Sequence, residues 1–326
     1  AQSPLSQAVM TEVVDAEHRA FPGHQKQLDQ TSGAANARDA FLSTTHGTYA
    51  NPADTRAKHG EHVAPVKGGT PGAQGKAVTL RIRHRLLQSG SSNLIANFRR
   101  SLRDADTSKA GSINVQELQR GCQLSSAPLD DVEARVLIKS LDKAGTGLAP
   151  VEDIVQTVRG EFTERRASLA DKVFTLLLRV CNGSVTLGRV LQLYDAAQHP
   201  DVVSGKTSLE AAAAYFAAQW DVVDAGEVIE RSEFVRVYAD WSFEINSDLA
   251  FEIMIRNTWH LSGGEGKSEN TSCRRVQVVH TNGRVTVEEI KDDLGVGEDA
   301  DAIRQNLINQ GIRDIAKIEF TIGKKK

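Results

Sequence analysis

Apolar residues recur three and four positions apart along the middle of the chain, from Ala77 to about Leu261. This spacing puts them on one face of a helix, as in helices that pack on a shared core. Short breaks that contain glycine interrupt the pattern roughly every 35 residues, which is the mark of a helix–loop–helix repeat. The pattern therefore predicts a mainly α-helical protein over this region.

Residues 1–76 show no such pattern. They are rich in Gly, Ala, Ser, Thr, Pro and His, and they carry few large apolar side chains at any helical or strand period. A segment of this composition cannot bury enough apolar surface to fold alone. Two interpretations are open: a disordered tail, or an extended N-terminal arm that becomes ordered by lying along a partner. We favour the extended arm.

The first break in the helical pattern has the spacing of a calcium-binding loop. With Asp106 at the first of twelve positions, Gly111 falls at the sixth, where the chain turns sharply, and Glu117 at the twelfth, where a carboxylate can give two oxygens. The candidate ligands are Asp106, Ser108, Ser112 through its backbone carbonyl, Asn114 and Glu117. Ala110 stands at the fifth position, where a ligand oxygen is expected. We therefore predict one weak calcium site at most.

The second break departs further from the calcium pattern. Asp142 and Gly147 hold the expected places, but Ala144 replaces an oxygen ligand. We place Leu148 one residue early, so that Asp153 ends a shortened loop. No calcium is expected there.

The third and fourth breaks are also expected to lack metal. The third has Leu178 and Val180 at ligand positions and Arg189 at the twelfth position, where its charge repels a cation. The fourth, residues 221–233, is one residue too long and has Val223 at a ligand position. Such loops can still pair through a short antiparallel bridge at their apolar eighth positions, and the candidates are Ile113, Leu148, Val185 and Val228.

The pattern changes after the polar linker of residues 262–272. The run RRVQVVHTNGRVTV predicts two short strands around Asn282-Gly283, a pair favoured in hairpin turns. Ile303 and Leu307 predict a helix, and residues 314–322 alternate as a strand. We predict a small α/β module over residues 273–326.

The segment after the hairpin turn has two further interpretations. Thr286 and Glu289 have the spacing of a capping box, which predicts a short helix that ends at Gly295. Alternatively, the segment is half of a fifth calcium loop, because Val285 and Glu289 are correctly spaced, although Val278 at the first ligand position argues against metal.

Length and composition set limits on the class of protein. A chain of 326 residues can form two or three compact units, and its net charge of −3 selects no partner. Its three cysteines are widely separated, without the C-x-x-C spacing of a zinc or redox site. The start lacks a secretory pattern, and no run approaches the roughly 20 apolar residues of a membrane helix. We expect a cytoplasmic protein with no membrane partner.

Catalysis has no visible basis in the sequence, so we expect no enzyme. The run SGKT at residues 204–207 resembles the end of a phosphate-binding loop, but Pro200 stands where a glycine is required, and there is no nucleophile elbow. Residues 81–85, with Arg99, Arg100 and Arg103, form a basic region that we interpret as a solvated helix face or a contact to an acidic polymer. Because no aromatic residues are interleaved with them, no nucleic-acid partner is expected.

Several segments occur in an order that resembles calcyphosin, a protein with four EF-hands, over about 180 residues. They are RLLQSGSSNL at 85–94, FRRSLRDAD at 98–106, YDAAQHPDVVSGKTS at 194–208 and INSDLAFEIMIRNTW at 245–259. The resemblance implies a calcium-binding fold made of two EF-hand pairs, here mostly degenerate. The domains expected are the arm (1–76), the first pair (77–160), the second pair (161–261), the linker (262–272) and the α/β module (273–326).

The resemblance and the arm together favour a non-catalytic structural protein of a cytoskeletal assembly. Degenerate EF-hand proteins with extended arms are familiar in ciliary and flagellar axonemes, so the expected partners are tubulin of the doublet microtubule and neighbouring axonemal proteins. The alternative is a cytosolic calcium sensor that uses the loop from Asp106 to Glu117.

Overall fold

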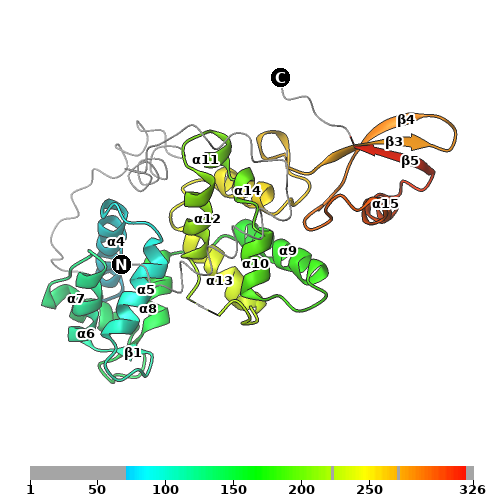
Figure 1. Ribbon diagram of the computed structural model, residues 1–326. Helices are drawn as coiled ribbons and strands as arrows, with labels where there is room; N and C mark the ends of the chain where they lie inside the picture. The colour runs from blue at the N-terminus through cyan, green and yellow to red at the C-terminus, as the bar shows by residue number, and fades with distance from the viewer. Residues whose placement is uncertain (1–70, 222–223, 270–271, 321–326) are drawn as a thin grey trace.

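The computed structural model describes residues 71–221, 224–269 and 272–320. The arm predicted for residues 1–76 therefore lies outside the described residues up to position 70. Residues 71–76, which we expected to be extended, form the beginning of helix α4 (Pro71–Gln88). Proline suits the first position of a helix because its φ is already helical and it has no N–H to leave unpaired. The described chain is mainly helical, with a small antiparallel sheet near its C-terminal end (Figure 1).

The first helical unit consists of α4 followed by two helix–loop–helix hairpins. The elements after α4 are α5 (Leu94–Ala105), β1 (Ser112–Ile113), α6 (Val115–Leu124), α7 (Asp131–Leu141), β2 (Ala149–Pro150) and α8 (Val151–Arg159). The antiparallel pairing of β1 with β2 joins the two loops. Helix α6 begins with a capping box between Asn114 and Glu117, which explains why the helix starts inside the loop.

Helix α4 contributes one face to the core of the first unit. Val78, Ile82 and Leu86 are four residues apart, and all three are buried in one cluster with apolar residues of α5 to α8. The helix lies against α7 and α8. It therefore completes the apolar core that the two hairpins build.

The second helical unit is larger and more aromatic. Its elements are α9 (Glu164–Val180), α10 (Leu187–Leu193), η1 (Ala196–Gln198), α11 (Pro200–Val203), α12 (Leu209–Ala217), α13 (Arg231–Ser242) and α14 (Asp248–Thr258). The rings of Tyr194 and Phe216 are stacked with their centroids 3.9 Å apart, and Trp259 meets both edge-on. The two loops of this unit approach each other through an isolated antiparallel bridge between Thr186 and Val228.

The C-terminal segment forms a β-hairpin, a helix and a third strand. After η2 (Gly266–Ser268), these are β3 (Arg275–His280), β4 (Val285–Glu289), α15 (Ala300–Asn309) and β5 (Ile315–Phe320). The sheet is antiparallel in the order β4-β3-β5, and Val276 and Val278 on β3 are buried with Ile303 and Leu307 of α15. The predicted hairpin, helix and final strand are confirmed.

The short helix predicted after Thr286 is wrong, and so is the alternative of half a calcium loop. The segment is strand β4, which pairs with β3 over five residue pairs from Val279–Val285 to Arg275–Glu289. A helix cap stabilises its helix by only about 1 kcal/mol. Each cross-strand pair of side chains adds its own contribution, and the pairing of β4 with β3 extends over the whole segment. The hairpin therefore determines the structure here.

Candidate calcium loop and its surroundings

The first loop closes around the carboxylate of Asp106. This residue follows α5, and the backbone N–H of Gly111 donates to Asp106 Oδ2 at 2.7 Å. The hydroxyl of Ser108 donates to Asp106 Oδ1 at 2.8 Å. Gly111 has a φ of 76°, a conformation that suits glycine, so the sixth position turns the chain as the spacing predicts.

Glu117 reaches back across the same loop from the first turn of α6. Its Oε1 accepts from the backbone N–H of Thr107 at 3.0 Å and from the Thr107 hydroxyl. Its Oε2 accepts from the backbone N–H of Asn114 at 3.0 Å, and Asn114 Oδ1 accepts in turn from the Glu117 N–H. Both carboxylate oxygens are thus engaged with the loop at its entry and exit.

Both loop carboxylates stay ionised at neutral pH. Burial acts to raise the pKa of Asp106, but hydrogen bonds from Ser108 and the Gly111 amide outweigh it and hold the pKa below its ordinary value. The pKa of Glu117 is also lowered, mainly by the hydroxyl of Thr107. The loop therefore carries two negative charges.

The donor atoms of this loop are all oxygens, which is the chemistry of a hard cation such as Ca²⁺. Asp106, Ser108, Asn114 and Glu117 bring side-chain oxygens to one loop, while Ala110 brings none. Among the described residues, no group of three or more His, Cys, Asp and Glu side chains is arranged to hold a metal ion. The residues thus fit a calcium ion with a reduced ligand set, and a bound ion would have to replace the internal hydrogen bonds of both carboxylates.

The second loop corrects the sequence interpretation. Ile113 pairs with Ala149, not with Leu148, which is exposed. Counted from Asp142, Ala149 is the eighth position and Asp153 the twelfth, so the loop has full length. The backbone N–H of Gly147 donates to Asp142 Oδ2 at 2.7 Å, as in the first loop.

The ligand positions of this second loop remain poor in oxygen. Ala144 lies at the third position, and Asp153 lies 3.7 Å from Lys143 Nζ. A lysine beside the twelfth position opposes a cation. The structure thus restores the length of this loop but not its ligands.

The third loop turns without a carboxylate. The backbone N–H of Gly183 donates to the carbonyl of Leu178 at 2.7 Å, so a peptide oxygen takes the role that Asp106 Oδ2 has in the first loop. In the pairing of this loop with the fourth, the Ile229 N–H donates to the Val185 carbonyl at 2.8 Å. Ile229 is buried while Val228 is exposed, so Ile229 and not Val228 is the apolar partner of Val185. Residues 222 and 223 of the fourth loop lie outside the described residues.

Part of the chain is similar to a crustacean protein. The chain is 26% identical over 180 residues to "Crustacean calcium-binding protein 23" of Faxonius limosus. The match covers 55% of this chain and 89% of that protein. No protein-family model matches the chain.

The two helical units meet at a buried group of charges that the sequence did not indicate. Arg99 of α5 is fully buried, and its guanidinium forms an ion pair with Asp240 of α13. Arg99 Nε also lies 3.0 Å from Glu152 Oε1 at the start of α8, and Asp240 faces a further arginine, Arg159. The attraction of these groups outweighs the desolvation that would lower the pKa of Arg99, and the pKa lies above its ordinary value.

This junction changes the interpretation of the basic region. Arg99 is not on a solvated face, and Arg100 and Arg103 bind Asp221 of the second unit with nitrogen–oxygen distances of 3.0 and 3.1 Å. Arg81 likewise pairs with Glu133 within the first unit. Asp240 lies 141 positions from Arg99 in the sequence, so no local spacing links the two residues. The one available signal was that Asp240 is a charged residue among the buried positions of α13.

The C-terminal module is held against the second helical unit by a histidine clamp. His260 lies between two carboxylates, with Nδ1 2.8 Å from Asp293 and Nε2 2.9 Å from Asp195. Burial acts to lower the pKa of His260, but the hydrogen bonds to Asp195 and Asp293 outweigh it and raise the pKa to about 9. The imidazole is therefore a cation at neutral pH.

Apolar contacts accompany the clamp. Leu294 is buried in the core of the second unit, and a Cβ on Gly295 would lie 2.7 Å from Val180 Cγ1. Val180 is the residue that occupies a ligand position in the third loop. One of the side chains that make the third loop unsuitable for calcium thus packs against the module.

Among the helices that the structure describes, none is long and apolar enough to cross a membrane.

Proposed function

We propose that this protein is a non-catalytic, calcyphosin-like EF-hand protein whose four hands form two pairs with a mainly structural role. The paired loops β1–β2 and the Thr186–Val228 bridge support the assignment of pairs, because EF-hand loops pair in this antiparallel manner. The crustacean relative, named as a calcium-binding protein, supports a calcium-binding role. The degenerate second and third loops support a limit of one working calcium site, at Asp106 to Glu117.

One observation carries the structural role: the buried ion pair of Arg99 and Asp240 between the two units. The guanidinium of Arg99 contacts both carboxylate oxygens of Asp240, so the units cannot move apart without breaking this pair and the contacts of Arg100 and Arg103 to Asp221. In a calcium sensor the two helices of a hand change their angle when calcium binds. Here α5, the helix before the first loop, is tied to the second unit through Arg99, Arg100 and Arg103. The junction supports a body that keeps its shape and serves as a scaffold.

We further propose that the assembly is the axonemal doublet microtubule of a cilium or flagellum, in the cytoplasm, and that the arm of residues 1–70 makes the main contact. The support is the calcyphosin resemblance and the composition of the arm. The test compares the full chain with a chain that begins at residue 71 in co-sedimentation with doublet microtubules.

We expect the full chain to sediment with doublet microtubules and the truncated chain to stay in solution. The melting temperatures of both should agree, because the core of the first unit, as far as the structure describes the chain, begins at Val78. Equal sedimentation of both chains would contradict the role of the arm, and failure of both would contradict the doublet as the assembly.

The second candidate function is a cytosolic calcium sensor, which the ionised Asp106 and Glu117 favour. The test is a calorimetric calcium titration of wild type and Glu117→Gln, with Asp153→Asn at the same position of the second loop as the control. We expect weak binding that Glu117→Gln reduces at least about tenfold, because it removes a bidentate carboxylate. Asp153→Asn should leave the affinity unchanged.

A dye that fluoresces on apolar surface separates the two functions. If the protein is a scaffold, the fluorescence of the dye should not increase when calcium binds to the wild type, because the apolar core stays buried. An increase that disappears in Glu117→Gln would establish the sensor and displace the scaffold. Absence of calcium binding even at millimolar concentration would remove the calcium site and leave the scaffold standing.

A further inference from the structure

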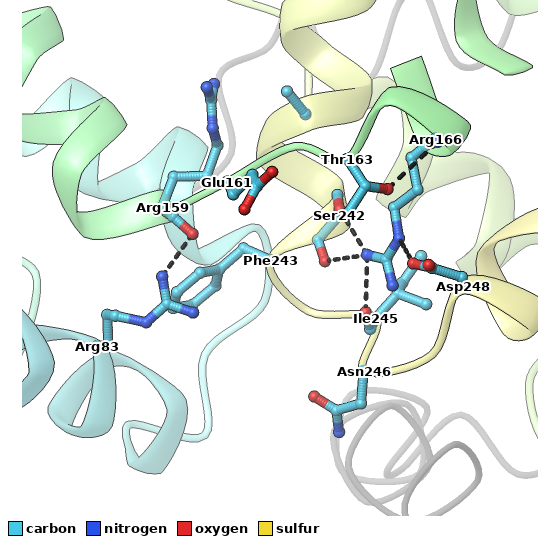
Figure 2. Close-up of a pocket in the computed structure, with 11 residues that line it drawn as sticks. Arg83, Arg159, Glu161, Thr163, Arg166, Ser242, Phe243, Ile245, Asn246 and Asp248 are labelled. Carbon is cyan, nitrogen blue, oxygen red and sulfur yellow. Dashed lines mark hydrogen bonds and ion pairs between the residues drawn. The ribbon is translucent and has the colours of Figure 1, made fainter. Parts of the chain in front are cut away.

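Two arginines that line the pocket between the helical units are held by groups of the protein itself (Figure 2). Arg166 Nε lies 2.6 Å from Asp248, and Arg83 Nη1 donates to the carbonyl of Arg159 at 2.6 Å. These donors are therefore used within the chain. Backbone groups that still face outward lie elsewhere, at the edge of the C-terminal sheet.

Strand β4 forms one edge of this sheet, whose strand order is β4-β3-β5. Figure 1 shows the sheet at one end of the molecule, with β4 along its outer side. An edge strand carries a row of backbone N–H and C=O groups that face away from the sheet, so it is a template for another strand. Residues 285–289 contain no proline, and their pairing with β3 has no bulge, so the devices that commonly prevent such pairing are missing from this edge.

The pairing with β3 determines which backbone groups of β4 face outward. The carbonyl of Arg284 accepts from a backbone N–H of β3 at 2.8 Å, and hydrogen-bonded positions alternate along an antiparallel strand. Thr286 and Glu288 therefore also turn their backbone groups toward β3, whereas Val285 and Val287 turn theirs outward. These two valines can form backbone hydrogen bonds with an added strand.

The same two valines have exposed apolar side chains. Val285 is 49% exposed and Val287 is 64% exposed. They lie on the face of the sheet opposite α15, because their partners on β3 alternate with Val276 and Val278, which are buried with residues of α15. An added strand would cover both side chains.

We propose that β4 pairs with β4 of a second copy of this chain, antiparallel and about a two-fold axis at Thr286. In this register Val285 lies opposite Val287 of the second copy, so the outward backbone groups of both residues meet and their side chains cover each other. Arg284 lies opposite Glu288 of the second copy, on the face that carries α15. The two-fold axis repeats each contact and closes the assembly as a dimer.

The charges of β4 favour a second copy as the occupant of this edge. Arg284 is exposed, and neither it nor Glu288 forms an ion pair with any described residue. The two charges lie on either side of Thr286 at equal spacing, as a two-fold axis at Thr286 requires. Centring the pair on Val287 would place Arg284 opposite Ile290 and leave both charges unpaired, so the charges select one register.

The experiment is sedimentation equilibrium of the full chain from micromolar to submillimolar concentration. We expect the wild type to form a weak, reversible dimer, since a single pair of strands is a small interface. Arg284→Glu and Glu288→Arg should each weaken it at least about tenfold, because each places like charges opposite each other twice. Arg313→Glu reverses an exposed arginine outside β4 and is the control, with the affinity of the wild type expected.

A mixture of the two charge variants tests the register itself. When Arg284→Glu pairs with Glu288→Arg, opposite charges face each other at both positions. The two variants should therefore form a dimer with each other more tightly than either forms one with itself. A chain with both substitutions should dimerise like the wild type.

Several outcomes overturn the proposal. A wild type that stays monomeric at the highest concentration does so, and so does a dimer of equal affinity in wild type, Arg284→Glu and Glu288→Arg, because its contact lies elsewhere. Species larger than a dimer that grow with concentration indicate head-to-tail contacts and contradict the two-fold axis. Should Arg284→Glu fail to fold, Glu288→Arg alone decides, since an unchanged dimer affinity in that variant contradicts the pairing.

Discussion

At the scale of single residues, the most unusual group is Glu244, a buried carboxyl at the junction of the two units. The hydroxyl of Tyr215 donates to its Oε2 at 2.6 Å, and the backbone N–H of Leu94, at the start of α5, donates to its Oε1 at 2.8 Å. Burial raises the pKa of Glu244 to about 7, and these hydrogen bonds only partly offset it. The protein therefore contains a carboxyl that titrates near neutral pH.

The direction of its pH dependence follows from the raised pKa. The folded state holds the proton more tightly than the unfolded state, so the contribution of Glu244 to stability is complete below pH 4.5 and is lost as pH rises to about 7. The shift corresponds to a loss on the order of 3 kcal/mol. Urea unfolding of wild type and Glu244→Gln between pH 5 and 8 checks this. The stability of wild type should fall relative to the variant, and parallel curves would contradict it.

At the scale of elements, the sequence predicted two turns that depend on local interactions, at Gly111 and at Asn282-Gly283. The structure also has a capping box between Asn114 and Glu117, residues that the sequence indicated only as candidate calcium ligands. The prediction failed after Thr286, where a capping-box spacing is equally present but the strand partner wins. Chain segments distant in sequence decide such cases, and periodicity alone contains no information on them.

In the loops, too, features set by neighbouring residues could be predicted, whereas features set by residues distant in the sequence could not. The sharp turn of the first loop could be predicted from the sequence, because it depends on the position of Gly111 alone. The bridge partners could not, since Ala149 and Ile229 differ by one position each from Leu148 and Val228. A register is set by which residue can be buried across the pair, and a slip of one residue exchanges the buried and the exposed side chain.

At the scale of the whole molecule, the sequence did not predict how the two helical units and the C-terminal module contact one another. Arg99 with Asp240 joins the two helical units, and His260 with Asp293 joins the second unit to the C-terminal module. Both contacts are ion pairs between residues far apart in the chain, and neither produces a periodic pattern. The linker at residues 262–272 therefore does not separate the module from the helices, although its composition is that of a spacer.

The histidine clamp leads to a prediction about docking of the module. His260 has its pKa raised to about 9, so its stabilisation is complete below the ordinary value of 6.5 and is lost as pH rises through about 9. His260→Ala removes the cation between Asp195 and Asp293 and leaves two carboxylates facing each other. We expect the linker to be cut by a protease several-fold faster in this variant than in wild type at pH 7.

An exposed histidine on α4 provides the matched control, and His84→Gln should be cut at the wild-type rate. Wild type should itself become more susceptible between pH 8 and 10, whereas His260→Ala should show no further change, because the group that titrates is gone. A wild-type cleavage rate that is constant over this range would contradict the clamp. A loss of helical content in His260→Ala would show that the histidine supports the second unit itself as well as the docked module, because His260 directly follows the buried Trp259.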